Sequence, residues 1–400
     1  MPPGREVVIR NKPYAHVSYP WGARVDLRSS RPRAFYAALI GQTLRYGMPA
    51  RRRLGPVWAL AGRRGVPEGI LARGVGLFPA AEEPEIDELL RSLAESWPEL
   101  ASRSRGLPPE PSSLSALAIA RSAGLTVFAF GDQATPLVVA KMATGAGTGG
   151  RLHIETEALR AADAAAVAPR DLGRVGRAQV QEGLAGAPLR VQPLTPERAE
   201  QLRFSSEHER LVAALMRLAS TTAAHGAPAG LPERIEAALH YEGLGHRARE
   251  LLAAAWRDVR RIDRSVLRHC DSSPQNCLFE DGRLTGIVDW ELADLRGAPG
   301  FDVWNSALSY IEHGLGLVKW SQELALEALA RSWGTSPFWL DARAAARRAA
   351  AAAGVEDAGM DALELVFFGS RIGDRLVMPE VRRGTGIATS ARMCELVAAA

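Results

Sequence analysis

Apolar and polar residues alternate in short blocks in the middle of the chain. Residues 265–268, Ser-Val-Leu-Arg, form a short strand-like segment that precedes a polar loop at 271–276, which contains Pro274. Two further apolar segments, 277–279 and 284–288, are separated by Glu-Asp-Gly-Arg. Short apolar segments joined by a turn that contains Asp-Gly are typical of a β hairpin. The pattern therefore predicts a strand, a polar loop and then a hairpin.

Strands and a helix are predicted before this hairpin, and helices are predicted after it. Upstream, residues 126–130 and 137–142 are apolar and strand-like, whereas residues 152–166 have a helical composition. Downstream the pattern indicates helices, one of them rich in alanine, which favours helix formation. These downstream helices are expected at residues 305–313, 321–333, 342–353 and 361–370. We therefore expect an α+β fold.

The first hundred residues follow another pattern. Residues 34–46 and 85–100 predict helices, and the Pro-rich segment 106–113 predicts a linker. Residues 1–75 contain 14 Arg and Lys against three Asp and Glu, a balance of +11. Because the whole chain carries +4, the remainder carries about −7. We treat residues 1–105 as a basic N-terminal extension of unknown role.

The positive charge of this extension has two interpretations. Arginine clusters at 51–53 and 63–64 can indicate an anionic partner, namely nucleic acid, an acidic lipid headgroup or a phosphorylated substrate. Alternatively, a solvated arginine-rich surface docks onto the acidic remainder of the chain. No nucleic-acid-binding motif accompanies the charge. The partner therefore stays open.

The rest of the composition limits the environment of the protein. No segment approaches the ~20 uncharged apolar residues of a membrane helix, and the first residues lack the apolar core of a signal peptide. The three cysteines show no paired or metal-like spacing. We therefore expect a cytoplasmic protein without a membrane span.

Three oxygen-bearing side chains lie close together in the hairpin region. Asp271 and Asn276 belong to the polar loop, and Asp289 follows the second hairpin strand. Phosphoryl transfer uses one carboxylate to deprotonate the attacking hydroxyl, and an amide oxygen with a second carboxylate to hold magnesium. The alternative is a turn rich in Asp, Asn and Pro whose side chains cap the backbone. The joint arrangement favours a magnesium-dependent site.

These residues also resemble the motifs of a known family. Residues 269–276 read HCDSSPQN and residues 287–291 read IVDWE, which resembles the H-x-D-x-x-x-x-N and I-x-D-W-E blocks of the aminoglycoside phosphotransferase and choline kinase-like family. The resemblance implies a bilobal protein-kinase-like fold, with a small antiparallel-sheet N-lobe and hinge at 110–185. It implies a mainly helical C-lobe, with the catalytic loop and acceptor-site helices, at 186–400. Cys270 departs from the family, which usually has glycine there.

Lysine is rare in this chain, so each lysine is informative. Lys12, Lys141 and Lys319 are the three present, and Lys141 lies on the predicted strand 137–142. A strand-borne ammonium is what a kinase uses against the α- and β-phosphates of its nucleotide. The alternative is a lysine that extends from a strand end to solvent.

An acidic residue on the following helix would hold this lysine. Glu155 shares the apolar helical face of Leu152 and Leu159, whereas Glu157 points elsewhere. We therefore predict an ion pair between Lys141 and Glu155. The alternative is that both glutamates are solvated.

Residues 180–189 resemble the hinge between the family's two lobes. The resemblance implies that the backbone of Gln181, Glu182 and Gly183 pairs with the adenine edge, although an ordinary strand and turn would give a similar pattern. Asp302 matches a family aspartate that braces the catalytic loop.

The residues together predict an ATP- and magnesium-dependent phosphotransferase that moves the γ-phosphoryl group to a hydroxyl of a small molecule. Asp271 would deprotonate the acceptor, and Asn276 and Asp289 would bind magnesium. Lys141, positioned by Glu155, would contact the α- and β-phosphates.

A second hypothesis is a catalytically weak pseudokinase or nucleotide-sensing binding protein whose basic N-terminal region binds an anionic partner. Under either hypothesis, the chain from residue 303 onward contains eleven acidic and ten basic residues. This balance disfavours a polycationic ligand such as an aminoglycoside, which would attract an acidic excess.

Overall fold

The structure is a computed structural model. It describes residues 14–18, 24–28, 77–78, 84–110, 114–121, 124–130, 136–143, 148–318, 322–333, 335–355, 360–377 and 386–399. The predicted helix at 34–46 and the arginine clusters at 51–53 and 63–64 lie outside these residues. The chain divides into a first unit, Met1–Arg160 with Pro169–Ala187, and a second unit, Ala161–Ala168 with Pro188–Ala400.

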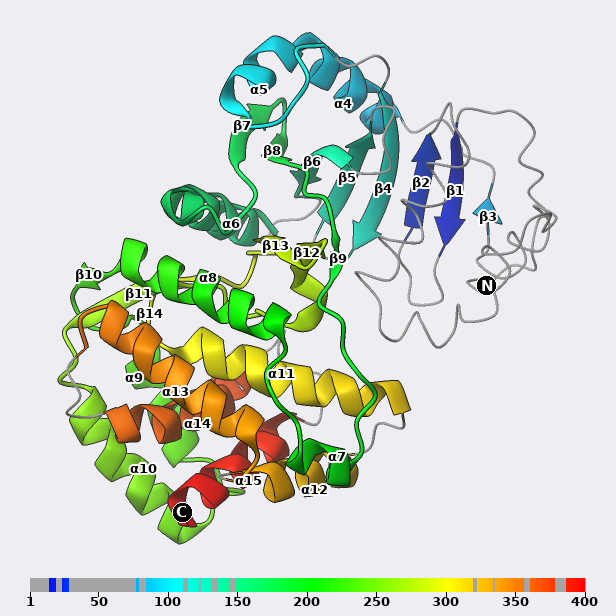
Figure 1. Cartoon of the computed structure of the whole chain (residues 1–400). Helices are drawn as coiled ribbons and strands as arrows, with labels where there is room; N and C mark the ends of the chain where they lie inside the picture. The colour runs from blue at the N-terminus through cyan, green and yellow to red at the C-terminus, as the bar shows by residue number, and fades with distance from the viewer. Residues whose placement is uncertain are drawn as a thin grey trace. The chain divides into compact units, whose positions relative to one another are not determined.

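The described part of the first unit is built on an eight-stranded antiparallel sheet (Figure 1). The strand order is β3-β1-β2-β4-β5-β6-β8-β7. The strands are β1 (Tyr14–Ser18), β2 (Arg24–Arg28), β3 (Leu77–Phe78), β4 (Ser115–Arg121), β5 (Gly124–Phe130), β6 (Pro136–Met142), β7 (Asp171–Val175) and β8 (Ala178–Glu182). Helix α6 (Thr148–Ala162) connects β6 to β7 and ends four residues earlier than predicted, in a short 3-10 turn (Asp163–Ala165).

Two helices from the region that we expected to form the extension pack against this sheet. They are α4 (Pro84–Glu95) and α5 (Trp97–Arg103), and they replace the single helix predicted at 85–100. Trp97, only 1% exposed, and Leu93 belong to one hydrophobic cluster with Val138 of β6 and Val180 of β8. Burying such large side chains stabilises the folded state by about 1.5–3 kcal/mol each. These helices therefore belong to the core of the first unit.

The second unit is mainly helical. Its helices are α7 (Pro196–Glu200), α8 (Ser206–Thr222), α9 (Leu231–Leu239), α10 (His246–Val259), α11 (Phe301–Val318), α12 (Gln322–Ser332), α13 (Pro337–Ala352), α14 (Met360–Val377) and α15 (Gly386–Ala399). Figure 1 shows α13 beside α8 and α11, with which it packs. An antiparallel-sheet unit followed by a helical unit confirms the predicted α+β fold class.

Short strands flank the loops of the second unit. They form the sheets β10-β11-β14 and β13-β12-β9. The strands are β9 (Ala187–Pro188), β10 (Ala224–His225), β11 (Arg264–Arg268), β12 (Cys277–Glu280), β13 (Arg283–Ile287) and β14 (Asp294–Gly297). The predicted hairpin is β12–β13, and its turn residues Asp281 and Gly282 have φ values of 49° and 72°. Positive φ at both positions is what a two-residue hairpin turn requires, and Asp-Gly supplies it.

Close packing of α14 depends on two glycines. A Cβ on Gly373 would lie 2.0 Å from the backbone oxygen of Arg234 on α9, and one on Gly369 would lie 2.6 Å from the Leu252 side chain on α10. Any larger residue would force the helices apart. None of the helices in the described part of the chain combines the length and apolar character needed to cross a membrane.

The core of the second unit contains a buried histidine. His208 on α8 is 3% exposed and packs against Phe204, Tyr310 and Phe338. Its Nδ1 lies 2.8 Å from the Ser205 hydroxyl, and its buried Nε2 has no hydrogen-bond partner among the described residues. Burial lowers the pKa of this imidazole to about 4.

This histidine should make stability depend on pH. In the unfolded chain His208 takes up a proton near pH 6.5, whereas in the folded state it stays neutral down to about pH 4. Proton uptake by the unfolded chain alone lowers the free energy of unfolding as pH falls from about 6.5 to about 4, by up to ~3 kcal/mol. In urea denaturation across this range, His208→Gln should lose that component and the exposed control His246→Gln should keep it. Parallel pH curves for the wild type and His208→Gln would contradict the assignment.

Candidate active site

One carboxylate holds the loop between β11 and β12. At the start of α11, Oδ2 of Asp302 accepts a hydrogen bond from His269 N–H at 2.6 Å, and Oδ1 accepts one from Cys270 N–H at 3.1 Å. Arg268 Nε lies 3.6 Å from the same carboxylate. Cys270 has a φ of 62°, and such a conformation costs a non-glycine residue about 1–3 kcal/mol. Asp302 therefore stabilises a turn that cysteine does not favour by itself.

The imidazole of His269 is fully buried and fixes the next part of the loop. Its Nδ1 accepts the backbone N–H of Asp271 at 3.1 Å, so this nitrogen carries no proton. Its Nε2 is therefore the protonated nitrogen and donates to the Val288 carbonyl at 2.9 Å. Trp290 packs edge-on at 4.5 Å between ring centroids. His269 thus hydrogen-bonds within the loop rather than offering a free base.

Asn276 connects the Asp271 loop to the end of the hairpin. Its Nδ2 donates to both the carbonyl oxygen and Oδ2 of Asp271, each at 2.9 Å, which directs Oδ1 away from Asp271. The Asn276 carbonyl accepts Val288 N–H at 2.9 Å, directly before Asp289. Asn276 ends a short 3-10 turn (Pro274–Asn276), directly before β12. The turn and hairpin bring Asp271, Asn276 and Asp289 together.

The two carboxylates of this group affect each other. Burial, followed by the negative charge of Asp289, raises the pKa of Asp271 to about 7. Hydrogen bonding from Asn276 and the charge of Arg371 act in the opposite direction. Asp289 has a φ of 69°, in the left-handed region that aspartate adopts more readily than most residues. Two adjacent carboxylates and an outward amide oxygen form a set of oxygen ligands that suits a hard divalent cation.

The first unit contains the predicted lysine pair. Lys141 on β6 places Nζ 2.6 Å from Oε1 of Glu155 on α6, and the two side chains are 15% and 3% exposed. Glu157, the rejected candidate, is 42% exposed and pairs with Arg160. The helical spacing thus distinguished the two glutamates correctly. Assignment of Lys141 and Glu155 to a nucleotide stays a prediction.

The predicted hinge residues lie at the end of β8. Gln181 is buried and pairs with Val139 of β6. Gly183 N–H donates to the Leu137 carbonyl at 2.8 Å. A Cβ on Gly183 would lie 1.8 Å from the carbonyl oxygen of Pro136, so this position requires glycine. The contact of Gln181, Glu182 and Gly183 with adenine stays a prediction.

The side chain of Glu182 has a local structural role. Its Oε1 accepts the Ser104 hydroxyl and the backbone N–H groups of Arg105 and Gly106, the latter two at 2.9 and 3.1 Å. These groups belong to the segment after α5. The carboxylate therefore ties that segment to the end of β8, a connection that sequence spacing did not indicate.

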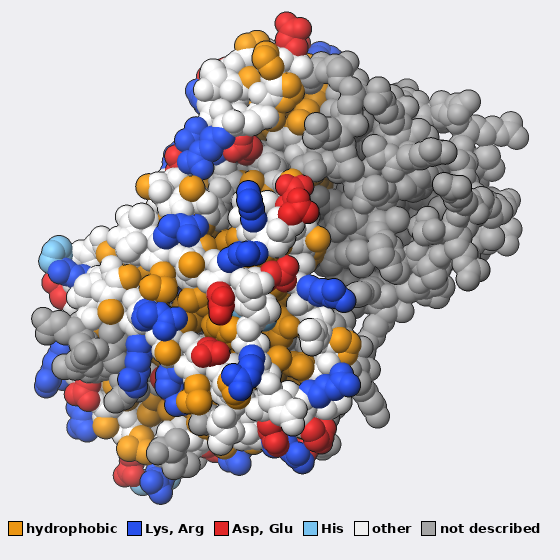
Figure 2. All heavy atoms as spheres, in the orientation of Figure 1, with side chains coloured by type: hydrophobic (Ala, Val, Ile, Leu, Met, Phe, Trp, Pro, Cys, Tyr) orange, Lys and Arg blue, Asp and Glu red, His pale blue; other side chains and the backbone are white. Residues whose placement is uncertain are grey.

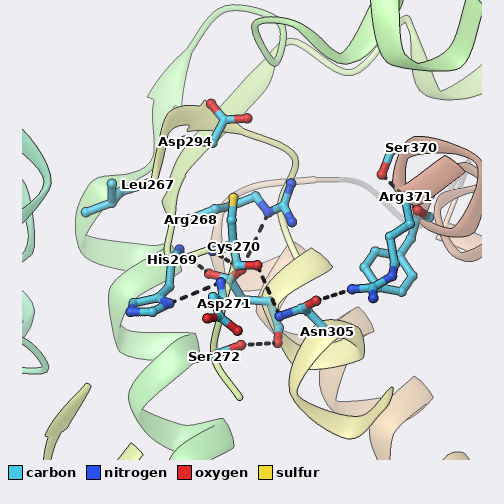
Figure 3. A network of polar contacts seen from close by, with 12 residues as sticks. Leu267, Arg268, His269, Cys270, Asp271, Ser272, Asp294, Asn305, Ser370 and Arg371 are labelled. Carbon is cyan, nitrogen blue, oxygen red and sulfur yellow. Dashed lines mark hydrogen bonds and ion pairs between the residues drawn. The ribbon is translucent and has the colours of Figure 1, made fainter. Parts of the chain in front are cut away.

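Two residues that the sequence motifs did not indicate join the loop in the second unit. Asn305, one turn after Asp302 on α11, donates from Nδ2 to the Cys270 carbonyl at 3.3 Å. Arg371 on α14 in turn donates to Oδ1 of Asn305 (Figure 3). The spacing of Asp302 and Asn305, which places them on one helical face, was an available signal. Arg371 had none, because it lies 66 residues further along the chain.

The chain matches one known protein family and is similar to several solved structures. The sequence model of the phosphotransferase enzyme family matches residues 116–352. The chain is similar to the solved structure of a macrolide 2′-phosphotransferase from Brachybacterium faecium, at 17% identity over 78% of this chain and 97% of that chain, with a TM-score of 0.40. It is also similar to the choline kinase from Streptococcus pneumoniae, at 13% identity over 74% and 92%, with a TM-score of 0.37. No curated protein matches the chain.

The loop should depend strongly on Asp302. In Asp302→Ala the N–H groups of His269 and Cys270 lose their acceptor, and buried Arg268 loses its counter-charge. Removing one partner of a buried ion pair typically costs 3–5 kcal/mol, so we expect a loss of about 3 kcal/mol or more in the free energy of unfolding.

Urea denaturation measures this change, and Asp302→Asn, which retains one oxygen acceptor, should lose less. The control Asp341→Ala removes an exposed carboxylate on α13 and should change stability by no more than about 0.5 kcal/mol. Equal stabilities of Asp302→Ala and the control would show that the carboxylate does not hold the loop.

Proposed function

The chain belongs to the phosphotransferase enzyme family, and we propose that it transfers the γ-phosphoryl group of ATP to a hydroxyl group of a small molecule. The membership confirms the predicted resemblance, and it makes the protein a phosphotransferase that acts on small molecules. The observation that carries the finer proposal is Asn276, whose side-chain amide donates to Asp271 and whose backbone carbonyl accepts Val288 N–H, directly before Asp289.

In the proposed reaction Asp271 accepts the proton of the acceptor hydroxyl. The acceptor oxygen forms a bond to the γ-phosphorus as the bond from that phosphorus to the β,γ-bridging oxygen breaks. The electron pair of the broken bond leaves with ADP. The Asp271 carboxylate is held by a hydrogen bond from Asn276 Nδ2, and its backbone is held by His269. These contacts would fix the orientation of the carboxylate toward the acceptor hydroxyl.

The donor set of this site fits magnesium. Among the described residues no group of three or more His, Cys, Asp or Glu could hold a metal ion, so the protein offers few ligands of its own. Oδ1 of Asn276 and the Asp289 carboxylate would supply two oxygens. A nucleotide-bound Mg²⁺ takes its remaining ligands from phosphate and water, and it neutralises charge on the phosphate oxygens.

The first unit would contribute the nucleotide contacts. The Lys141 ammonium, held by the buried Glu155 carboxylate, would bind the α- and β-phosphates. The backbone of residues 181–183 would pair with the adenine edge. A cytoplasmic location and an anionic partner for residues 1–75 remain predictions that rest on the sequence.

Replacing Asp271 separates catalysis from binding. Asp271→Asn keeps the size of the side chain and removes the proton acceptor, so kcat should fall by about 10²- to 10⁴-fold while Mg·ATP still binds. Transfer from γ-labelled ATP to a panel of hydroxylated metabolites measures kcat, and nucleotide titration measures binding. The exposed control Asp258→Asn on α10 should behave as the wild type.

Two other results would contradict the proposal in different ways. Undiminished transfer by Asp271→Asn would exclude this residue as the base. ATP binding without transfer to any member of the panel by the wild type would favour the pseudokinase hypothesis instead.

The lysine pair offers a matched comparison on one helix. Glu155→Gln removes the charge that positions Lys141, so KM for ATP should rise by about tenfold or more, equivalent to about 1.4 kcal/mol. Glu157→Gln, two residues away and outside the pair, should leave KM unchanged. The same KM for both variants would exclude the ion pair from nucleotide binding.

A further inference from the structure

Helix α14 carries two arginines, one of which is connected to the candidate catalytic loop. Arg371 and Arg375 are one helical turn apart, a spacing that places them on the same helical face. Arg371 is connected to the loop through Asn305, which bonds to the Cys270 carbonyl (Figure 3). Its charge acts on the carboxyl group of Asp271. The proposed base therefore lies within electrostatic reach of a guanidinium group that is connected to the same loop.

The described residues do not satisfy all the donors of either arginine. The Nε of Arg371 is buried and has no hydrogen-bond partner among the described residues. Arg375 is half-buried, and burial followed by the charge of Arg371 lowers its pKa to about 10. Within the described chain we find no hydrogen bond or ion pair from its guanidinium. Two like charges held one turn apart repel each other, so an anion between them would stabilise the pair.

The acidic groups near these arginines do not neutralise them. Asp374, between them in sequence, binds Arg234 Nε at 2.9 Å. Glu312 on α11 attracts Arg375 through its charge but forms no ion pair with it in the described structure. His313, the next residue on α11, bonds through Nδ1 to the Ser309 carbonyl, and burial lowers its pKa. Among the described residues, the two arginines thus retain an excess of positive charge.

We propose that the acceptor is a hydroxylated small molecule carrying an oxyanion, a carboxylate or a phosphate monoester, which Arg371 and Arg375 bind while its hydroxyl group faces Asp271. This rests on the proposed phosphotransferase function. The planar guanidinium fork matches both oxyanions, because it donates two parallel hydrogen bonds. An arginine that merely stabilised the C-terminal end of α14 would need no such burial.

The same charges disfavour a cationic acceptor. A polycation would approach two arginines instead of the acidic groups that would attract it. On the face of the molecule in Figure 2, basic and acidic side chains are interspersed over the second unit, and no acidic field is gathered there. This agrees with the nearly equal numbers of acidic and basic residues from residue 303 onward.

A matched set of acceptors tests the proposal by transfer. Glycerate, glycerol 3-phosphate, glycerol and 2-aminoethanol each carry a hydroxyl but differ in charge and in the kind of oxyanion. With γ-labelled ATP, the wild type should show kcat/KM at least about tenfold higher for one of the two anions than for glycerol, and lowest for the cation. The better anion identifies carboxylate or phosphate as the preferred group.

Substitutions of the two arginines test whether they bind the anionic acceptor. Arg375→Gln should raise KM for the preferred anion by about tenfold or more, with a smaller change in kcat, and Arg375→Lys should recover part of the loss. Arg371→Gln should do the same and also lower kcat, because Arg371 is connected to the loop. Arg348→Gln, an exposed arginine on α13, is the control and should leave both constants unchanged.

Binding without transfer separates this proposal from the proposed function. In the presence of saturating Mg·ADP, the preferred anion should raise the melting temperature of the wild type, and Arg375→Gln should abolish that shift. A shift without transfer to any of the four acceptors would retain the oxyanion site and refute the phosphotransferase proposal for these acceptors. Equal transfer to all four, or a shift unchanged in Arg375→Gln, would overturn the oxyanion site.

Discussion

The candidate active site depends on the two hydrogen bonds that Asp302 accepts from the loop backbone. Those bonds hold His269 and Cys270 in a turn that includes a left-handed cysteine. The imidazole of His269 can then reach both the Asp271 backbone and the Val288 carbonyl. One buried carboxylate at a helix N-terminus thus connects the strand before the loop, the loop itself and the end of the hairpin. Without it, the candidate site residues would not be held in a common arrangement.

Each unit of the protein contributes a different kind of electrostatic preorganisation. In the second unit, burial and the neighbouring charge of Asp289 both raise the pKa of Asp271, which favours its protonation. In the first unit, the buried carboxylate of Glu155 holds an ammonium group in place. The first arrangement suits a divalent cation and the second suits phosphate oxygens, which is the division that phosphoryl transfer from a nucleotide requires.

The two arginines of α14 extend this logic to the acceptor. The helix that carries them packs closely on α9 through Gly373, so its position is defined by backbone contact rather than by flexible side chains. Arg371 reaches the loop through Asn305. In the proposed role, a cationic group at this position would orient an anionic acceptor at Asp271 and would repel a polycation.

The sequence alone determined the features that depend on local geometry. The β12–β13 hairpin follows from its Asp-Gly turn, and the choice of Glu155 over Glu157 follows from helical periodicity. The family motifs lie within eight residues or fewer, so they too could be read directly.

Only the tertiary structure decided which distant groups meet. It brought Arg371 to the catalytic loop, tied Glu182 to the segment after α5 and packed Trp97 against the sheet. Such contacts depend on how complete helices and strands pack. No periodicity or spacing within one segment contains that information, because packing is determined by the combined shape and burial of many separate segments.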